Sequence, residues 1–191
     1  MSEEDASSAV AVVDRDPQGD LITWLNTRDR IGPKAVVTDL HQLSATLRRL
    51  NKEGVQVVLI DQPPGYSPLL SESLKNSNLG LICSMSGRSD INATKEAINI
   101  AREHDINFRT VLNKGIFRAK ITGWGFDQLE EMGNFIPYPI YQRVEMAEAV
   151  VNNLFVQEWK KFGKSAKEIN KISRSVSQAL DLGGNWEGIK I

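Results

Sequence analysis

The chain has 191 residues, 41% of them hydrophobic and 25% charged, which suits a folded domain with its own core and excludes a disordered segment. The net charge is −1, so any nucleic-acid binding has to come from a local basic patch. Cys83 is the single cysteine, which excludes an internal disulfide and a cysteine-based zinc site. The apolar run around Cys83 predicts a buried structural thiol.

The N-terminus is acidic and polar, unlike a targeting peptide, and no apolar run approaches the roughly 18 residues of a membrane span. We therefore expect a cytoplasmic protein with no membrane partner.

Apolar runs and amphipathic stretches alternate along the chain, which predicts an α/β fold with a mostly parallel sheet flanked by helices. The predicted strands are 9–13, 35–37, 55–60, 79–85, 108–112 and 135–136. The predicted helices are 20–28, 40–52, 68–76, 90–104, 121–132, 144–152 and 157–180. By domain, we expect a flexible acidic N-terminus at 1–8, an α/β domain at 9–154, an amphipathic basic helix at 155–182 and a loose tail at 183–191.

Four of the predicted strands end in polar residues. They supply Asp14 and Asp16, then Asp61, then the segment 86–90, and finally Asn113. Ligands of open α/β sheets bind beyond the carboxyl ends of the strands, so these residues share a rim. A carboxylate there can hold Mg²⁺, a second can position a water, and an asparagine can read a base edge. Each feature alone is more typical of a turn or helix cap, whereas their order along one chain is more specific.

In this order the motifs resemble those of the ParA/MinD family of deviant Walker ATPases, and within it the plasmid and chromosome partition proteins. The matching segments are VVDRDPQGDLITWL at 12–25, VVLIDQPPGYSPLLSESLKNSNLGLI at 57–82, NATKEAINIAREHDINFRTVLNK at 92–114 and IPYPIYQRVEMAEAV at 136–150. The resemblance extends from Ala9 to about Leu154. It implies a P-loop NTPase-like fold with ATP and Mg²⁺ as cofactors.

The resemblance also implies roles for individual residues. Asp16 would orient the hydrolytic water, and Asp61 and Asp14 would lie on the Mg²⁺ side. Asn113 and Pro137 would lie on the adenine side. The second switch would consist of Gln62, Pro63, Pro64 and Gly65.

The chain departs from the family at the phosphate-binding loop. Family members carry a KGGxGKT loop on a strand–loop–helix unit of roughly 30 residues before the first acidic strand. Here eight residues, MSEEDASS, precede Ala9, and the string Gly163-Lys164-Ser165 is expected inside a helix. We therefore expect the first strand–P-loop–helix to be missing from this fold. We also expect the sheet to close up, with 55–60 paired directly to 79–85.

The predicted C-terminal helix has two faces. One is apolar and consists of Phe155, Trp159, Phe162, Ala166, Ile169, Val176 and Leu180. The other carries a cationic stripe, Lys160, Lys164, Lys167, Lys171 and Arg174. One interpretation is a solvated face on a docked helix, and the other is a non-specific DNA contact of the kind that partition ATPases make through basic C-terminal surfaces.

Three functions are consistent with these observations. The first is a ParA-like regulator without a P-loop, which binds DNA or a ParB-like or full-length ParA-like partner and does not hydrolyse ATP. The second is a truncated or mis-started partition ATPase that binds and hydrolyses ATP when complete. The third is a ParA-like accessory protein of conjugative DNA transfer. Whether the chain is an enzyme stays open, and a homodimer is possible by resemblance.

Overall fold

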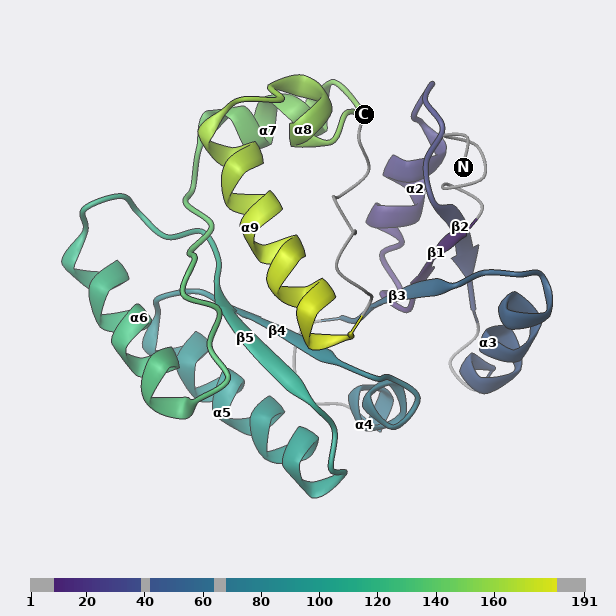
Figure 1. Cartoon of the computed structure of the whole chain (residues 1–191), viewed down its shortest axis with the longest axis horizontal. Helices are drawn as coiled ribbons and strands as arrows, with labels where there is room; N and C mark the ends of the chain where they lie inside the picture. Colours follow the sequence, from purple (N-terminus) through teal and green to yellow (C-terminus); the bar gives the residue numbers. More distant parts are fainter. Residues whose placement is uncertain (1–8, 39–41, 64–67, 182–191) are drawn as a thin grey trace. The chain divides into compact units, whose positions relative to one another are not determined.

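The computed structural model describes residues 9–38, 42–63 and 68–181 (Figure 1). The predictions for the N-terminal segment 1–8, for Pro64 and Gly65, and for the tail 183–191 fall outside these residues. Contacts divide the chain into two compact units, Met1–Asn76 and Ser77–Ile191. Among the described helices, none has the length and apolar character to cross a bilayer.

The first unit is a parallel three-stranded sheet with helices between its strands. In chain order its elements are β1 (Val10–Asp14), α2 (Asp20–Asn26), β2 (Lys34–Val37), α3 (Leu43–Lys52), β3 (Val57–Asp61) and α4 (Pro68–Lys75). The strand order is β2-β1-β3, so the first strand is central. Asp14 lies opposite both Val37 and Asp61, which places the two acidic strand ends side by side.

Burial in the first unit follows the hydrophobic pattern of the sequence. Ala11 and Val13 of the central strand are fully buried, as expected of a strand with a neighbour on each side. They pack with the α3 stripe, in which Leu43 and Leu50 are fully buried. Gly54, at φ +85°, follows the helix and turns the chain back toward β3.

The second unit is built on a parallel pair of strands. Its elements are β4 (Gly80–Ser84), α5 (Arg88–Glu103), β5 (Phe108–Leu112), α6 (Lys120–Met132), α7 (Val144–Val151), α8 (Val156–Trp159) and α9 (Lys164–Ala179). Leu112 of β5 packs with Ile91 of α5 and Leu129 of α6, and Val111 packs on the other face with Ile172 of α9. Figure 1 accordingly shows α5 and α6 on one side of β5 and α9 on the other.

The segment after α6 runs beside β5 and continues the sheet without forming a full strand. The Ile136 amide donates to the Thr110 carbonyl at 2.9 Å, and the Ile140 amide donates to the Leu112 carbonyl at 2.8 Å. Phe135 forms a parallel bridge with Thr110. The predicted short strand at 135–136 is therefore a single bridge, followed by a segment in which Pro137 lies beside β5, between these two hydrogen bonds.

The prediction of a buried Cys83 is wrong, because its side chain is exposed. Cys83 lies opposite Val111 in the parallel register, and the next residue on its face of β4, Leu81, is 43% exposed. Within the second unit, α9 covers this face of β5 but leaves the same face of β4 open.

Within the first unit β3 pairs with β1, and within the second unit β4 pairs with β5. The direct pairing of 55–60 with 79–85 would join the two units, and it stays a prediction.

The predicted continuous helix at 157–180 is two helices instead. The first, α8, ends at Trp159, and α9 begins at Lys164 after a turn in which the Gly163 amide donates to the Lys160 carbonyl at 2.8 Å. A Cβ on Gly163 would lie 3.0 Å from that carbonyl oxygen, so the turn is suited to glycine. The break turns Phe162 outward, and this ring, predicted on the apolar face, is 81% exposed.

Candidate functional site

The acidic strand ends of the first unit come together as the sequence predicts. Asp14 and Asp61 occupy paired register positions at the ends of β1 and β3. Asp16 follows in the turn before α2, where the Gly19 amide donates to its carbonyl at 3.0 Å. Gly19 has φ +64°, a left-handed conformation that glycine adopts without strain. Three carboxylates are thus grouped at one edge of one sheet.

Backbone groups hold two of these carboxylates in place. Asp14 is 3% exposed and accepts hydrogen bonds from the amides of Asp16 at 2.9 Å and Ile22 at 3.3 Å. Asp16 in turn accepts from the amide of Gln18 at 2.9 Å. Asp14 therefore fixes the turn and the start of α2, whereas Asp61 stands at the open end of its strand.

The negative charge of this cluster changes the pKa of Asp61. Burial of the carboxyl raises the pKa of Asp61 above its usual range, and the negative charges of Asp14 and Asp16 raise it further. The amide of Gln62 acts against this rise by a backbone hydrogen bond. An uncompensated group of carboxylates of this kind suits a hard cation such as Mg²⁺ in its chemistry. Among the described residues, however, no three acidic, histidine or cysteine side chains already form a metal-binding cluster.

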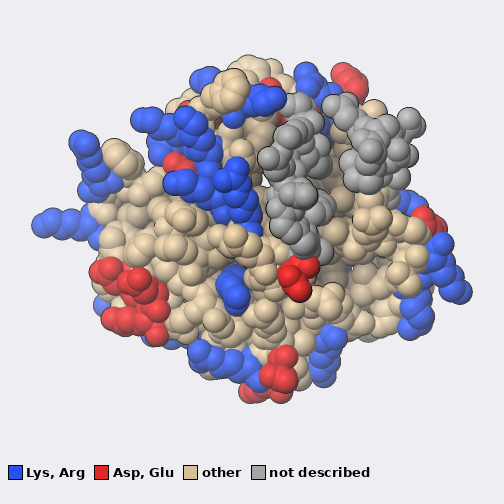
Figure 2. Space-filling view, viewed as in Figure 1, with Lys and Arg blue, Asp and Glu red and all other residues tan. Residues whose placement is uncertain are grey.

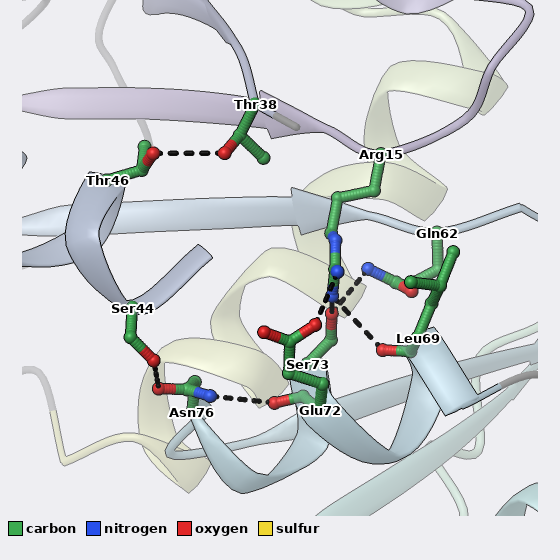
Figure 3. Close-up of polar contacts among 9 residues, drawn as sticks. All are labelled: Arg15, Thr38, Ser44, Thr46, Gln62, Leu69, Glu72, Ser73 and Asn76. Carbon is green, nitrogen blue, oxygen red and sulfur yellow. Dashed lines mark hydrogen bonds and ion pairs between the residues drawn. The ribbon is translucent and has the colours of Figure 1, made fainter. Parts of the chain in front are cut away.

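A buried arginine inside the acidic motif is the feature that sequence reasoning missed. Side chains alternate along a strand, so Arg15, between Asp14 and Asp16, points away from the acidic cluster and toward α4 (Figure 3). Its Nη1 donates to the Leu69 carbonyl at 3.1 Å and to the Ser73 hydroxyl at 2.5 Å. Its Nη2 forms an ion pair with Glu72 at 2.6 Å.

The first residue of the predicted second switch joins the same network. The Gln62 side-chain amide donates to the Ser73 hydroxyl at 2.6 Å (Figure 3). Ser73 is 4% exposed and thus accepts from both Arg15 and Gln62 inside the first unit. The sequence gives one indication of a buried polar contact here, the polar pair Glu72-Ser73 in an amphipathic helix. It does not indicate which cation the pair binds.

The two residues predicted on the adenine side lie in the second unit. Asn113 follows β5, where its amide donates to the Ser84 carbonyl at 2.7 Å and its side-chain oxygen accepts from the Lys114 amide at 2.9 Å. Pro137 is exposed in the segment that runs beside β5. Asn113 follows the end of β5 and Pro137 lies beside that strand, whereas the three carboxylates belong to the first unit.

The cationic stripe is exposed on the second unit. Lys164, Lys167, Lys171 and Arg174 are exposed along α9, and Figure 2 shows Lys and Arg side chains gathered over this helix. Lys160 lies before the helix break, 3.9 Å from a carboxylate oxygen of Glu148. The stripe is therefore four cations on one rigid helix with a fifth on the preceding turn.

Acidic neighbours of α9 are directed inward and paired. Glu168 accepts from the Arg143 guanidinium at 2.6 Å and from the Tyr141 amide at 3.1 Å. Glu145 of α7 accepts from the Ser165 amide at 3.4 Å, at the first turn of α9. The Gly163-Lys164-Ser165 string therefore opens a helix whose N-terminus faces a carboxylate, an arrangement that opposes phosphate binding there.

Comparison with known proteins gives a fold but no close relative. No protein-family model and no curated protein sequence matches the chain. Among solved structures, MinD of Pyrococcus horikoshii, a septum site-determining protein complexed with Mg-ADP, is 14% identical with a TM-score of 0.72, over 96% of this chain and 89% of that one. The MinC:MinD cell division protein complex of Aquifex aeolicus also matches, with 16% identity and a TM-score of 0.69 over 92% of this chain and 88% of that one.

A putative plasmid partition protein of Borrelia burgdorferi bound to AMPPNP is 12% identical, with a TM-score of 0.71 over 89% of this chain and 86% of that one. The chain thus has the α/β fold of the MinD- and ParA-type ATPases, as its motifs predict.

Proposed function

We propose that this chain is a ParA-like partition protein that binds nucleic acid through helix α9. The observation that carries this proposal is the exposed cationic stripe, on a helix that is docked by its opposite face. Ile172 of α9 is 7% exposed and packs with Val111 and Ile136, so the helix has a fixed orientation. The cations on its outer face are then held in one row, which suits a polyanion.

The nucleotide side of the proposal rests on the acidic cluster. Asp61, with Asp14 and Asp16 nearby, would hold Mg²⁺ directly or through water, and Asp16 would orient a water. Asn113 and Pro137 would contact the adenine. We also propose that this chain regulates or recruits a partner, such as a ParB-like or full-length ParA-like protein.

The test is DNA binding by the 191-residue chain as a function of salt. Four to five phosphate contacts predict a log–log slope of about −3 to −4.5, depending on the strand form. The double variant Lys164→Glu/Lys171→Glu should bind far more weakly and with a shallower slope. The matched control, Lys52→Glu/Lys95→Glu, changes two exposed lysines on α3 and α5 and should bind like the wild type. Binding that ignores both salt and the α9 reversal would refute the proposal.

A second candidate, a partition ATPase of which these residues are a part, is favoured by the grouped carboxylates. Asp14 and Asp61 end the paired strands β1 and β3, with Asp16 two residues on, and such a group of carboxylates suits the Mg²⁺ that accompanies a nucleotide. An in-frame KGGxGKT sequence in the DNA upstream of the start codon would favour this candidate. Millimolar ATP binding by the longer product, and none by the present 191 residues, would establish it.

A further inference from the structure

Three aromatic rings of the second unit are exposed where a folded domain would normally bury them. Phe162 is 81% exposed, Phe117 is 59% exposed and Tyr138 is 38% exposed. Burying one large apolar side chain is worth about 1.5–3 kcal/mol, so three rings left in solvent form a surface that a partner can cover.

Two of these rings contact a cation. The guanidinium of Arg118 lies over the Phe117 ring at 5.1 Å, and the ammonium of Lys171 lies over the Tyr138 ring at 4.9 Å. Phe162 lies on the turn that leads into α9, between Lys161 and Lys164 in the sequence.

The ring of Phe117 is displayed by a rigid loop between β5 and α6. The Ile116 amide and carbonyl both bond to the Thr122 hydroxyl at 2.9 Å, and a Cβ on Gly115 would approach the Thr122 methyl at 3.0 Å. Arg118 has φ +61°, a conformation that is rare outside glycine. The loop thus exposes an apolar ring next to an arginine whose backbone is strained. Local backbone strain of this kind is common at functional sites.

A series of contacts connects this loop to α9. The Phe117 ring meets the Tyr141 ring edge-to-face at 5.5 Å. The Tyr141 amide donates to Glu168 of α9, which also pairs with Arg143. Tyr138, in the same segment, reaches Lys171 of α9. The loop, the segment 138–143 and α9 therefore form one surface, which we call the ring–cation surface. Figure 2 shows further Lys and Arg side chains beside this loop at the edge of the view.

We infer that the ring–cation surface binds single-stranded nucleic acid, with the cations on the phosphates and the rings stacked on unpaired bases. This inference rests on the proposed function, because it uses the α9 cations. It adds that the nucleic acid they bind is single-stranded. A duplex hides its base faces, so exposed rings gain little from it. An unpaired strand offers every base as a flat partner, and basic grooves with interleaved aromatic rings are typical of such sites.

The experiment measures the affinity of the whole chain for a mixed-sequence DNA single strand, the matching RNA strand and the DNA duplex, in one buffer. We expect the single strands to bind more tightly than the duplex at equal salt. Phe162→Ala and Phe117→Ala should each weaken single-strand binding by about 5- to 100-fold, the range that base–aromatic stacking supplies, and change duplex binding little. Phe117→Trp, which keeps an aromatic ring at this position, should bind single strands like the wild type. The control Met85→Ala removes a 43% exposed side chain outside the surface and should have no effect.

The outcomes separate the two proposals. If Lys164→Glu/Lys171→Glu weakens binding but the ring variants do not, the α9 contact stands and the single-strand inference falls. If no nucleic acid binds, the proposed function itself fails. If the ring variants instead abolish binding to phosphatidylglycerol vesicles and leave the single strands unaffected, the surface is a membrane contact and the inference is overturned. Circular dichroism of Phe117→Ala and Phe117→Trp verifies that each variant folds.

Discussion

Arg15 carries a charge into the interior of the first unit, where its side chain is 0% exposed. Its ion pair with Glu72 and its bonds to Ser73 and Leu69 fasten the acidic strand end to α4. Removing one partner of a buried ion pair leaves the other polar groups unsatisfied. The DRDPQG motif identifies the acidic strand end from sequence alone, whereas the role of Arg15 depends on where α4 packs, and no local pattern encodes that.

We predict that Arg15→Met lowers the free energy of unfolding of the first unit by about 2–4 kcal/mol. Arg48→Met, which removes an exposed arginine of α3, should change it by less than about 0.5 kcal/mol. Urea denaturation of both variants provides the measurement. Equal midpoints for the two would mean that the Arg15 network contributes nothing to stability.

The raised pKa of Asp61 predicts the sign of a pH effect. The Asp61 carboxyl binds a proton more readily in the native state than in the unfolded chain. Its contribution to stability is therefore lost as the pH rises from 3.8, the ordinary pKa of an aspartate, through the raised pKa of the native state. At pH 7 the charged carboxylate opposes folding. Asp61→Asn should therefore stabilise the unit at pH 7, by less than about 1 kcal/mol because the site is open to solvent, and the gain should vanish below pH 3.8. If Asp61→Asn is less stable than the wild type at pH 7, repulsion between Asp61 and the other two carboxylates does not destabilise the native state.

At the scale of single elements, helix α6 holds two glycines in contrasting surroundings. A Cβ on Gly125 would lie 3.0 Å from the Cα and Cβ of Ser86, whereas a Cβ on Gly123 would meet nothing within 4 Å. Gly125→Ala should therefore push α6 from the loop after β4 and destabilise the second unit by about 1–3 kcal/mol. Gly123→Ala should stabilise it by about 0.5–1 kcal/mol through helix propensity. Thermal unfolding of this matched pair should give shifts of opposite sign, and shifts of the same sign would contradict the packing at Ser86.

Element positions were largely predictable, because most helices and strands follow a simple period. The Leu43–Leu50 stripe and the apolar strands appear where the sequence places them. The C-terminal helix was not predicted correctly, since its 3.6-residue period runs through the turn at Lys160–Gly163 without a visible interruption. Only the contact of Gly163 with the Lys160 carbonyl reveals the break, and with it the exposed ring of Phe162.

For the whole molecule, the order of motifs was enough to predict the fold. Solved structures of the MinD and ParA type share this fold at 12–16% identity, as the order of the motifs along the chain predicts. The neighbour of each strand within its unit was not predictable, because strand periodicity says which face is buried and nothing about which strand lies beside it.

The central claim is that these 191 residues bind nucleic acid through α9 without needing a nucleotide. The most direct test compares DNA affinity with and without millimolar ATP and Mg²⁺, while calorimetry follows nucleotide binding in the same samples. We predict equal DNA affinity in both conditions, whether or not the heat of ATP binding is detected, and a loss of DNA binding on Lys164→Glu/Lys171→Glu. DNA binding that appears only with ATP, together with a saturable heat of nucleotide binding, would contradict the account.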